Sequence, residues 1–172
     1  MKLTVKELTV FSMLAAVMYV SKLVMEFLPN IHLLGVFVVS FTIVYRKKAL
    51  YPIYLFVFLT GLLNGFNTWW IPYLYLWTVL WAAVMVLPKR LPPKAAPLIY
   101  MIVCGLHGLA YGTFYAPFQA LMYGLNMEGM IGWIIAGLPF DITHGISNFI
   151  CGILILPIVS TLKQAEIIIK NN

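Results

Sequence analysis

The sequence predicts an all-α integral membrane fold, a single domain over residues 1–172 built as a bundle of six transmembrane helices. Hydrophobic residues make up 63% of the chain and charged residues only 9%. Soluble domains average about 25% charged residues, so this composition cannot cover a water-facing surface. Six apolar runs follow one another along the chain, and the basic residues fall in short clusters between them.

The first three runs fill the N-terminal part of the chain. A bilayer core about 30 Å thick needs roughly 20 apolar residues per helix. The first run, from about Leu8 to Leu28, meets this length and holds only two charged residues, Lys22 and Glu26. Their i,i+4 spacing lets them neutralise each other on one helix. A shorter second run covers Ile31 to Tyr45, and the third covers Leu50 to Gly65.

The fourth run, Ile71 to Leu87, starts at a group of aromatic residues that includes Trp69, Trp70 and Tyr73. Amphipathic rings of this kind belong at the boundary between membrane and water. The fifth run covers Leu98 to Tyr123. Its glycines share one helix face, and their spacing allows another helix to approach closely.

The sixth run extends from about Leu138 to Leu162 and starts with Pro139. Proline suits the first turn of a helix, so Asp141 is expected near the outer membrane surface. The preceding stretch, Gly124 to Gly137, mixes glycine with polar residues. It is predicted to be a long outer loop or a shallow interfacial helix.

The charge pattern predicts that both termini face the cytoplasm. Six spans and a cytoplasmic start would place segments 1–7, 46–49, 88–97 and 163–172 inside. These segments hold ten of the eleven basic residues: Lys2, Lys6, Arg46, Lys47, Lys48, Lys89, Arg90, Lys94, Lys163 and Lys170. Such an excess of Lys and Arg fixes orientation in membranes. The net charge of +6 is therefore interpreted as a topology signal, and no nucleic-acid partner is expected.

Several classes of site find no support in the sequence. No G-x-x-x-x-G-K-[ST] loop is present to hold phosphates, and neither H-E-x-x-H nor a G-x-S-x-G elbow occurs. No catalytic residue and no cofactor are predicted. His32, His107 and His144 fall on three different runs, and nothing in their spacing indicates a metal site. Cys104 and Cys151 are interpreted as small apolar fillers.

The sixth run carries the clearest functional candidates. At about 100° per residue, Asp141, His144 and Asn148 lie on one stripe of an otherwise apolar helix. Burying an ionisable group inside a membrane costs free energy, so such a residue is first interpreted as part of a functional site. The stripe is therefore expected to line a pocket that opens to the outside. The alternative is a hydrogen-bond network that only holds the helices together.

Other runs supply further candidates for the same pocket. On the fifth run His107 and Tyr111 form an aromatic stripe with Phe114 and Phe118, which is either pocket wall or ordinary core. Glu26, a charged residue within an apolar run, is expected either to contact the ligand or to pair with Lys22. The connection between the third and fourth runs adds amide and indole side chains that suit a flat polar ligand. The alternative is that the tryptophans only anchor the chain at the membrane–water interface. These residues are Asn64, Asn67, Trp69 and Trp70.

The cytoplasmic half of the first run carries a small-residue patch: Ser12, Ala15, Ala16 and Tyr19. Small residues let another helix approach closely, so the patch predicts either a partner contact or internal packing.

Taken together, these features resemble the substrate-binding S component of energy-coupling factor (ECF) vitamin transporters. The length, six spans and inside termini are similar, and Ser12-x-x-x-Ala16 resembles the family's alanine-x-x-x-alanine signature with Ser in place of the first alanine. The stretch 137–148, Gly-Leu-Pro-Phe-Asp-Ile-Thr-His-Gly-Ile-Ser-Asn, resembles the start of the last helix in several members. The resemblance covers the whole chain.

The resemblance implies binding of a water-soluble vitamin or precursor in the outer half of the bundle, in a bacterial inner or plasma membrane. It implies a transmembrane coupling protein that meets the patch around Ser12, Ala15 and Ala16, and two ATP-binding cassette ATPases. A charge at Asp141 would suit a protonated amine or ring-nitrogen donor, so pyrimidine and pyridine vitamins are candidates.

Two further interpretations compete with this one. A self-sufficient secondary transporter or small channel would show matched helix breaks in its two halves. A membrane-embedded hydrolase using Asp141 and His144 would need a nucleophile facing the same cavity, and Ser147 is badly placed around the helix for that role.

Overall fold

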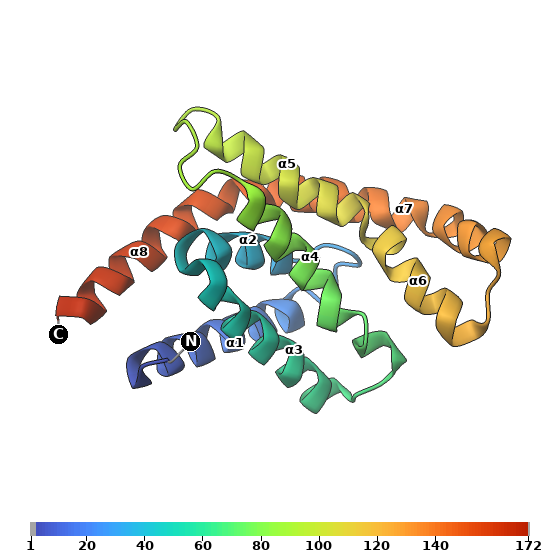
Figure 1. Ribbon diagram of the computed structural model, residues 1–172, viewed down its shortest axis with the longest axis horizontal. Coiled ribbons are helices and arrows are strands. Elements are labelled where there is room, and N and C mark those ends of the chain that lie inside the picture. The colour runs from blue at the N-terminus through green and yellow to red at the C-terminus, as the bar shows by residue number, and fades with distance from the viewer. Residues whose placement is uncertain (1–2, 172) are drawn as a thin grey trace.

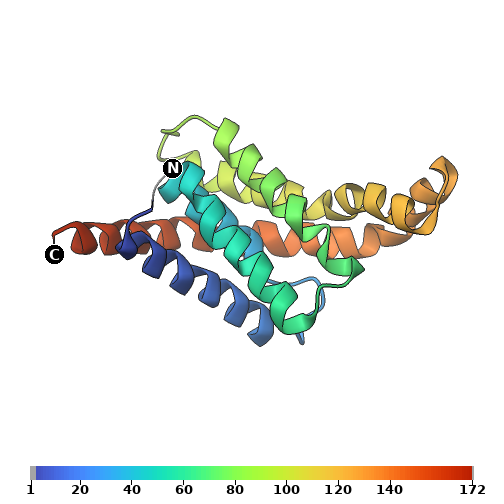
Figure 2. The same cartoon turned by 60° about the horizontal axis from the view of Figure 1, so that its bottom comes forward.

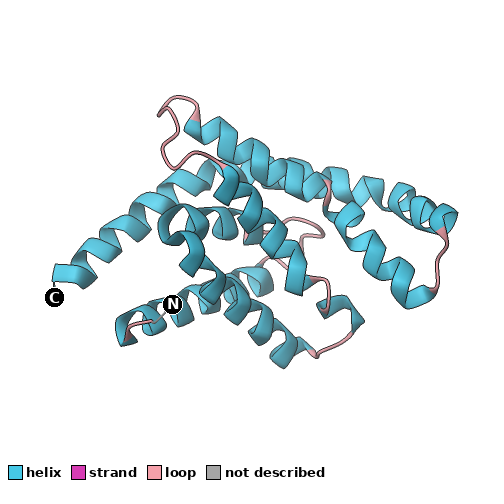
Figure 3. Ribbon diagram, in the orientation of Figure 1, coloured by secondary structure: helices cyan, strands magenta, loops and turns pink. Residues whose placement is uncertain are grey.

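The computed structural model describes the backbone of residues 3–171 and the side chains of residues 3–166. Every regular element in this part of the chain is helical (Figure 3). The elements in chain order are α1 (Val5–Val24), α2 (Leu34–Tyr45), η1 (Arg46–Ala49), α3 (Leu50–Asn64), η2 (Thr68–Trp70), α4 (Tyr73–Val86), α5 (Ala96–Leu109), α6 (Tyr111–Tyr123), α7 (Met127–Cys151), η3 (Gly152–Leu154) and α8 (Ile155–Asn171). The predicted all-α fold is confirmed.

Local sequence signals set several helix ends. Thr4 and Glu7 form a reciprocal capping box at the start of α1. The side chain of Asn126 accepts a hydrogen bond from the Gly129 amide and so caps α7. Gly124 ends α6 with a φ of 64°, a left-handed conformation that glycine adopts without steric penalty.

The second helix is the central element of the bundle. Residues 34–42 of α2 are all buried, and α2 packs against α4 and α8 as well as α1, α5 and α7. A helix that is apolar all round is stable only when it is enclosed, so the composition of α2 matches its position. The core formed around it includes Phe41, Phe56 and Trp77.

The outside of the bundle is also apolar. Large hydrophobic side chains are exposed on α1, α5 and α7, among them Met13, Leu106 and Ile146. Soluble monomers rarely expose contiguous apolar surface on this scale. Four helical segments, Val5–Val24, Thr68–Val86, Ala96–Tyr123 and Met127–Glu166, are long and apolar enough to cross a bilayer. The chain is therefore a membrane protein.

Two of the six expected runs lie outside these four segments. The run Ile31–Tyr45 yields α2 with 12 residues, and Leu50–Gly65 yields α3 with 15 residues. Both fall short of the roughly 20 residues that a straight membrane span requires. The six-span count thus stays a prediction for these two helices.

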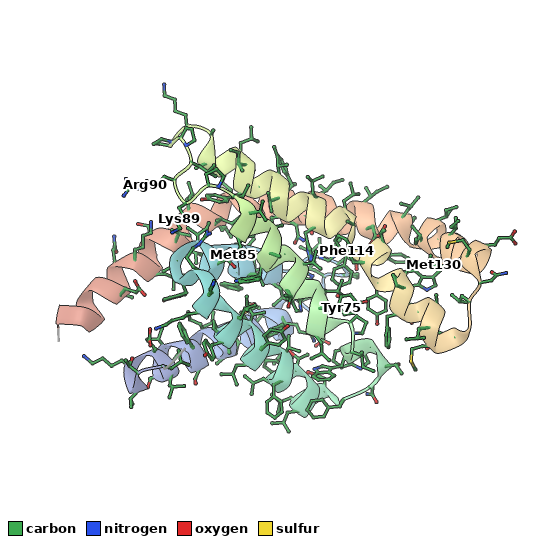
Figure 4. All side chains as sticks on the ribbon, in the orientation of Figure 1. Tyr75, Met85, Lys89, Arg90, Phe114 and Met130 are labelled. Carbon is green, nitrogen blue, oxygen red and sulfur yellow. The ribbon has the colours of Figure 1, made fainter. Side chains whose placement is uncertain are left out.

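The connections of the bundle separate into two ends. Lys48 pairs with Glu7, which joins η1 to the start of α1. The guanidinium of Arg46 donates to the carbonyl of Met85 at 3.1 Å, so the end of α4 lies at the same place. Figures 1 and 2 show the N-terminus, the C-terminus, η1 and the α4–α5 loop toward one side of the molecule. We call this side the basic end, and Lys89 and Arg90 lie on its α4–α5 loop (Figure 4).

The α1–α2, α3–α4 and α6–α7 connections lie toward the opposite end (Figure 2). Tyr19 donates to the Asn64 side chain at 3.0 Å there, and Ser147 donates to the Asn30 carbonyl at 3.0 Å. Of the ten basic residues assigned to the inside, Lys2 and the side chain of Lys170 lie outside the described residues.

The structure corrects the predicted start of the last run. Gly124–Gly137 is not a loop, because α7 begins at Met127 and continues without a break to Cys151. Pro139 consequently lies inside α7 and not in its first turn. The hairpin of α6 and the first half of α7 extends away from the other helices (Figure 1).

The fifth and sixth runs are each divided. Ala110 separates α5 from α6, which change direction at this residue, and η3 separates α7 from α8 (Figure 1). The predicted Lys22–Glu26 pair is also wrong. Since α1 ends at Val24, Glu26 lies in the following turn, and no ion pair joins it to Lys22 within the described part of the chain.

Candidate functional site

Buried polar side chains gather between α2, α4, α5 and α7, toward the α1–α2 connection. Asp141 and His144 are 5% and 4% exposed, and Asn148 is fully buried. They lie one helical turn apart on α7, as the periodicity predicted. With residues from three other segments they form what we call the buried polar cluster: His32, Trp77, His107, Asp141, His144 and Asn148.

Ring contacts connect the members of this cluster. The rings of His32 and His144 lie 4.6 Å apart between centroids in an edge arrangement. Trp77 lies 6.2 Å from His32 and 6.0 Å from His107. Tyr111 contacts His144 at 4.8 Å and so joins α6 to the cluster. The three histidines from three runs thus meet in space.

The histidines do not form a metal site in this arrangement. The described residues include no group of three His, Cys, Asp or Glu side chains placed to hold a metal ion. His107 Nε2 lies 3.0 Å from the carbonyl of Leu76. A carbonyl only accepts, so Nε2 carries the proton and Nδ1 is left as an acceptor.

Asp141 bridges two helices at the break after α5. Its Oδ1 accepts a hydrogen bond of 2.9 Å from the amide of Gly112, in the first turn of α6. First-turn amides have no partner within their own helix, and the N-terminal end of a helix favours negative charge. A Cβ built on Gly112 would lie 2.3 Å from Asp141 Oδ2, so only glycine leaves room for the carboxylate.

A cleft of about 340 Å³ opens beside Asp141 and His144. Aromatic rings form much of its wall, with Tyr115 and Trp133 stacked at 5.8 Å and 17°. Tyr115 also donates to the Trp69 carbonyl at 3.4 Å, which connects α6 to η2. The lining residues are Asn30, Tyr111, Gly112, Tyr115, Gln119, Trp133, Gly137, Phe140, Asp141 and His144.

Unpartnered polar atoms are confined to this region. Within the described residues, each buried side-chain nitrogen or oxygen without a hydrogen-bond partner belongs to the buried polar cluster. They are His32 Nδ1, Trp77 Nε1, His107 Nδ1, Asp141 Oδ2, His144 Nε2, and Asn148 Nδ2 and Oδ1. Native proteins satisfy most buried polar groups, so a concentration of unsatisfied atoms requires a physical explanation.

The structure divides the predicted substrate contacts into two groups. It brings together Asp141, His144, Asn148, His107 and Tyr111. The residues predicted near the third-to-fourth connection do not line the cleft, although the Trp69 carbonyl accepts from its lining residue Tyr115.

Asn64 and Asn67 are exposed, and Asn64 accepts a hydrogen bond from Tyr19. Trp70 donates to the Val57 carbonyl at 2.7 Å, which anchors η2 on α3, and Trp69 packs on Tyr73 at 5.7 Å. None of these four residues, nor the exposed Glu26, lines the cleft.

The small-residue patch is only partly available on the surface. Ser12 and Ala16 are exposed on α1, whereas Ala15 is fully buried in the core. The hydroxyl of Tyr19 is bonded to Asn64. A partner helix could therefore reach Ser12 and Ala16 but not Ala15.

Sequence reasoning missed Trp133, Tyr115 and Gln119 as lining residues. The signal for Trp133 was present, because positions 133, 137 and 141 are spaced four residues apart and share a helix face. It was hidden because 124–137 was predicted to be an outer loop or a shallow interfacial helix, separate from the last run. His32 was noted in the sequence but not assigned to the site.

Comparison of the chain with models of known protein families, with curated proteins and with solved structures finds no match.

Proposed function

We propose that this chain is a membrane-embedded binding subunit for uptake of a small water-soluble organic solute, a vitamin or a vitamin precursor. The observation that carries the proposal is the confinement of all unpartnered buried side-chain atoms of the described residues to one cluster beside a 340 Å³ cleft. Ligand sites combine apolar walls with a few convergent polar groups, and this site has both. A network that only held helices together would pair its own donors and acceptors.

The proposal includes six membrane passes with both termini in the cytoplasm of a bacterial cell. The gathering of Arg46, Lys48 and Lys89 at the basic end supports this orientation, because positively charged connections stay inside. In this arrangement α2 and α3 are two short passes, of which α2 is enclosed by other helices and α3 is exposed on one face. The cleft then faces the outer half of the membrane.

Energy would come from separate subunits, namely a transmembrane coupling protein and two ATP-binding cassette ATPases. The sequence has no phosphate-binding loop, and the exposed Ser12 and Ala16 offer a close-approach surface to another helix. The proposed role is binding and not catalysis. In support, the Ser147 hydroxyl lies 3.0 Å from the carbonyls of Asn30 and His144, which share its single proton, and Ser147 does not line the cleft.

One observation favours a self-sufficient secondary transporter as the alternative. Transporters of that class bind solutes at broken helices, and α5 breaks from α6 at Ala110, next to Asp141. Uptake by purified chain alone in sealed vesicles, without ATPase subunits, would support this alternative. Uptake that requires ATP and partner subunits would exclude it.

A ligand screen tests the central proposal. Native mass spectrometry and calorimetry of the purified protein against B vitamins and their precursors should find one compound bound per chain. Asp141→Asn should then weaken that affinity by at least tenfold. Asparagine still accepts the Gly112 hydrogen bond but removes the charge at the unpartnered oxygen.

Glu128→Gln is the matched control, since Glu128 is an exposed acidic residue in the first turn of the same helix. Its affinity should equal that of the wild type. A screen without any bound compound contradicts the proposed function, and an unchanged affinity in Asp141→Asn returns Asp141 to a purely structural role at the start of α6.

A further inference from the structure

The cleft reaches only part of the buried polar cluster. Asp141 and His144 line it, and each contributes one unpartnered atom. The remaining unpartnered atoms belong to His32, Trp77, His107 and Asn148, which do not line the cleft. A solute confined to the cleft would leave these groups without hydrogen-bond partners.

Tyr111 stands between the two regions. It lines the cleft, and its ring centroid lies 6.2 Å from both His107 and Trp77 on the inner side. His144 holds a similar position, with its ring 4.6 Å from His32. Tyr111 directly follows the Ala110 break, and rotation of its side chain would connect the cleft with the inner atoms.

The inner groups have a defined chemistry. Trp77 offers a donor, His107 Nδ1 an acceptor, and the Asn148 amide one of each. Trp77 is 1%, His107 5% and Asn148 0% exposed, so water outside the bundle cannot satisfy them. None of these side chains carries a fixed charge, and their mixture of donors and acceptors suits a hydroxyl or carboxamide group.

We infer that the site has an inner compartment beyond Tyr111 that receives an uncharged hydrogen-bonding group of the solute, such as a hydroxyl or carboxamide. Its lining residues are His32, Trp77, His107 and Asn148. This inference rests on the proposed function and adds a second contact region to it. The solute is then bipartite, with a flat ring between the aromatic walls of the cleft and a neutral polar group directed inward.

Thiol alkylation by iodoacetamide tests the inner compartment, because this small reagent carries a carboxamide itself. Cys104 and Cys151 are first replaced by alanine, and single cysteines are placed as Asn148→Cys and His107→Cys. Val38→Cys, at a fully buried position of α2 outside the cluster, is the matched control. Both inner cysteines should be alkylated at least tenfold faster than Val38→Cys. Adding Tyr111→Ala should raise the alkylation rate of Asn148→Cys further.

Gln119→Cys, on the cleft wall, separates this inference from the proposed function. Fast alkylation there, with both inner cysteines as slow as Val38→Cys, would overturn the inner compartment and leave the cleft intact. That result would indicate that the polar atoms around Asn148 either bind enclosed water or have no hydrogen-bond partner at all. Slow alkylation at Gln119→Cys as well would contradict the proposed function itself, since the cleft would then be closed to small polar molecules.

Discussion

Asp141 illustrates how one side chain serves two purposes through its two oxygens. Oδ1 accepts the amide of Gly112 and so stabilises the start of α6, while Oδ2 is buried without a partner. The structural bond fixes the orientation of the carboxylate in the wall of the cleft, and its second oxygen remains without a partner. Binding groups held rigidly in this way avoid the entropy loss of ordering on ligand binding.

Gly112→Ala should lower both the melting temperature and the affinity for the solute. The new methyl would lie 2.3 Å from Asp141 Oδ2 and 2.9 Å from Oδ1, so the carboxylate or the helix must shift. Thermal unfolding in detergent and calorimetric binding measure the two effects.

Gly132→Ala provides the control within α7, because no atom lies within 4 Å of the position its Cβ would take. Alanine is preferred to glycine inside helices by about 1 kcal/mol, so its melting temperature should stay equal or rise. Equal behaviour of the two variants would contradict the close packing of α6 on Asp141.

The stripe Asp141, His144 and Asn148 could be predicted from the sequence because helical periodicity alone places these residues on one face. Glu26 could not be assigned in this way, since its position depended on where α1 ends. The tryptophans near η2 have two physical uses, interface anchoring and ligand stacking, and composition does not distinguish them. Trp70 turns out to donate to the Val57 carbonyl.

Among the elements, α7 shows where sequence reasoning failed. Its first turns contain glycine and an acidic residue, which suggest an outer loop or a shallow interfacial helix when the segment is read alone. Packing of α7 against α5 and α6, together with the Asn126 cap, makes the segment helical. Tertiary contacts override weak helix propensity in this way, because most helix stability in proteins comes from packing.

The exposed face of α1 supports a test of partner binding. Ser12→Trp and Ala16→Trp should leave solute binding unchanged, since both residues are exposed and neither lines the cleft. They should abolish ATP-dependent uptake by blocking close approach of another helix. Binding to purified protein and uptake by whole cells are the two measurements.

Leu106→Trp, at an exposed position of α5, is the control for bulk on the lipid-facing surface and should keep full uptake. Ala15→Trp should instead destabilise the fold, because Ala15 has no exposed surface. Normal uptake in both Ser12→Trp and Ala16→Trp would rule out a partner at this patch.

At the scale of the whole molecule, the basic connections gather at one end. The N-terminus, η1 and the α4–α5 loop lie at one end of the folded chain, as the alternation of apolar runs and basic clusters indicated. The lengths of the passes were less predictable. An apolar run does not reveal whether lipid or other helices will surround it, and α2 is surrounded by helices.

Single cysteines can establish the orientation in cells. With Cys104 and Cys151 replaced by alanine, Lys94→Cys in the α4–α5 loop should react with a membrane-impermeant maleimide only after the cells are opened. Asn126→Cys, between α6 and α7, should react in intact cells. Labelling of both cysteines from the same side would require an even number of passes between them, or none, and would reject the six-pass arrangement, which has one pass there.

The short, enclosed α2 has a consequence for how the protein is made. Its 12 residues give about 18 Å of helix, well below the thickness of the hydrocarbon layer. In a nascent chain that ends shortly after residue 49, α2 alone would be too short to stay inserted across the bilayer. We therefore expect α2 to be committed to the bilayer together with α3, as a helical pair, while α1 already lies there to receive it. Assembly and insertion would then be a single step for this part of the chain.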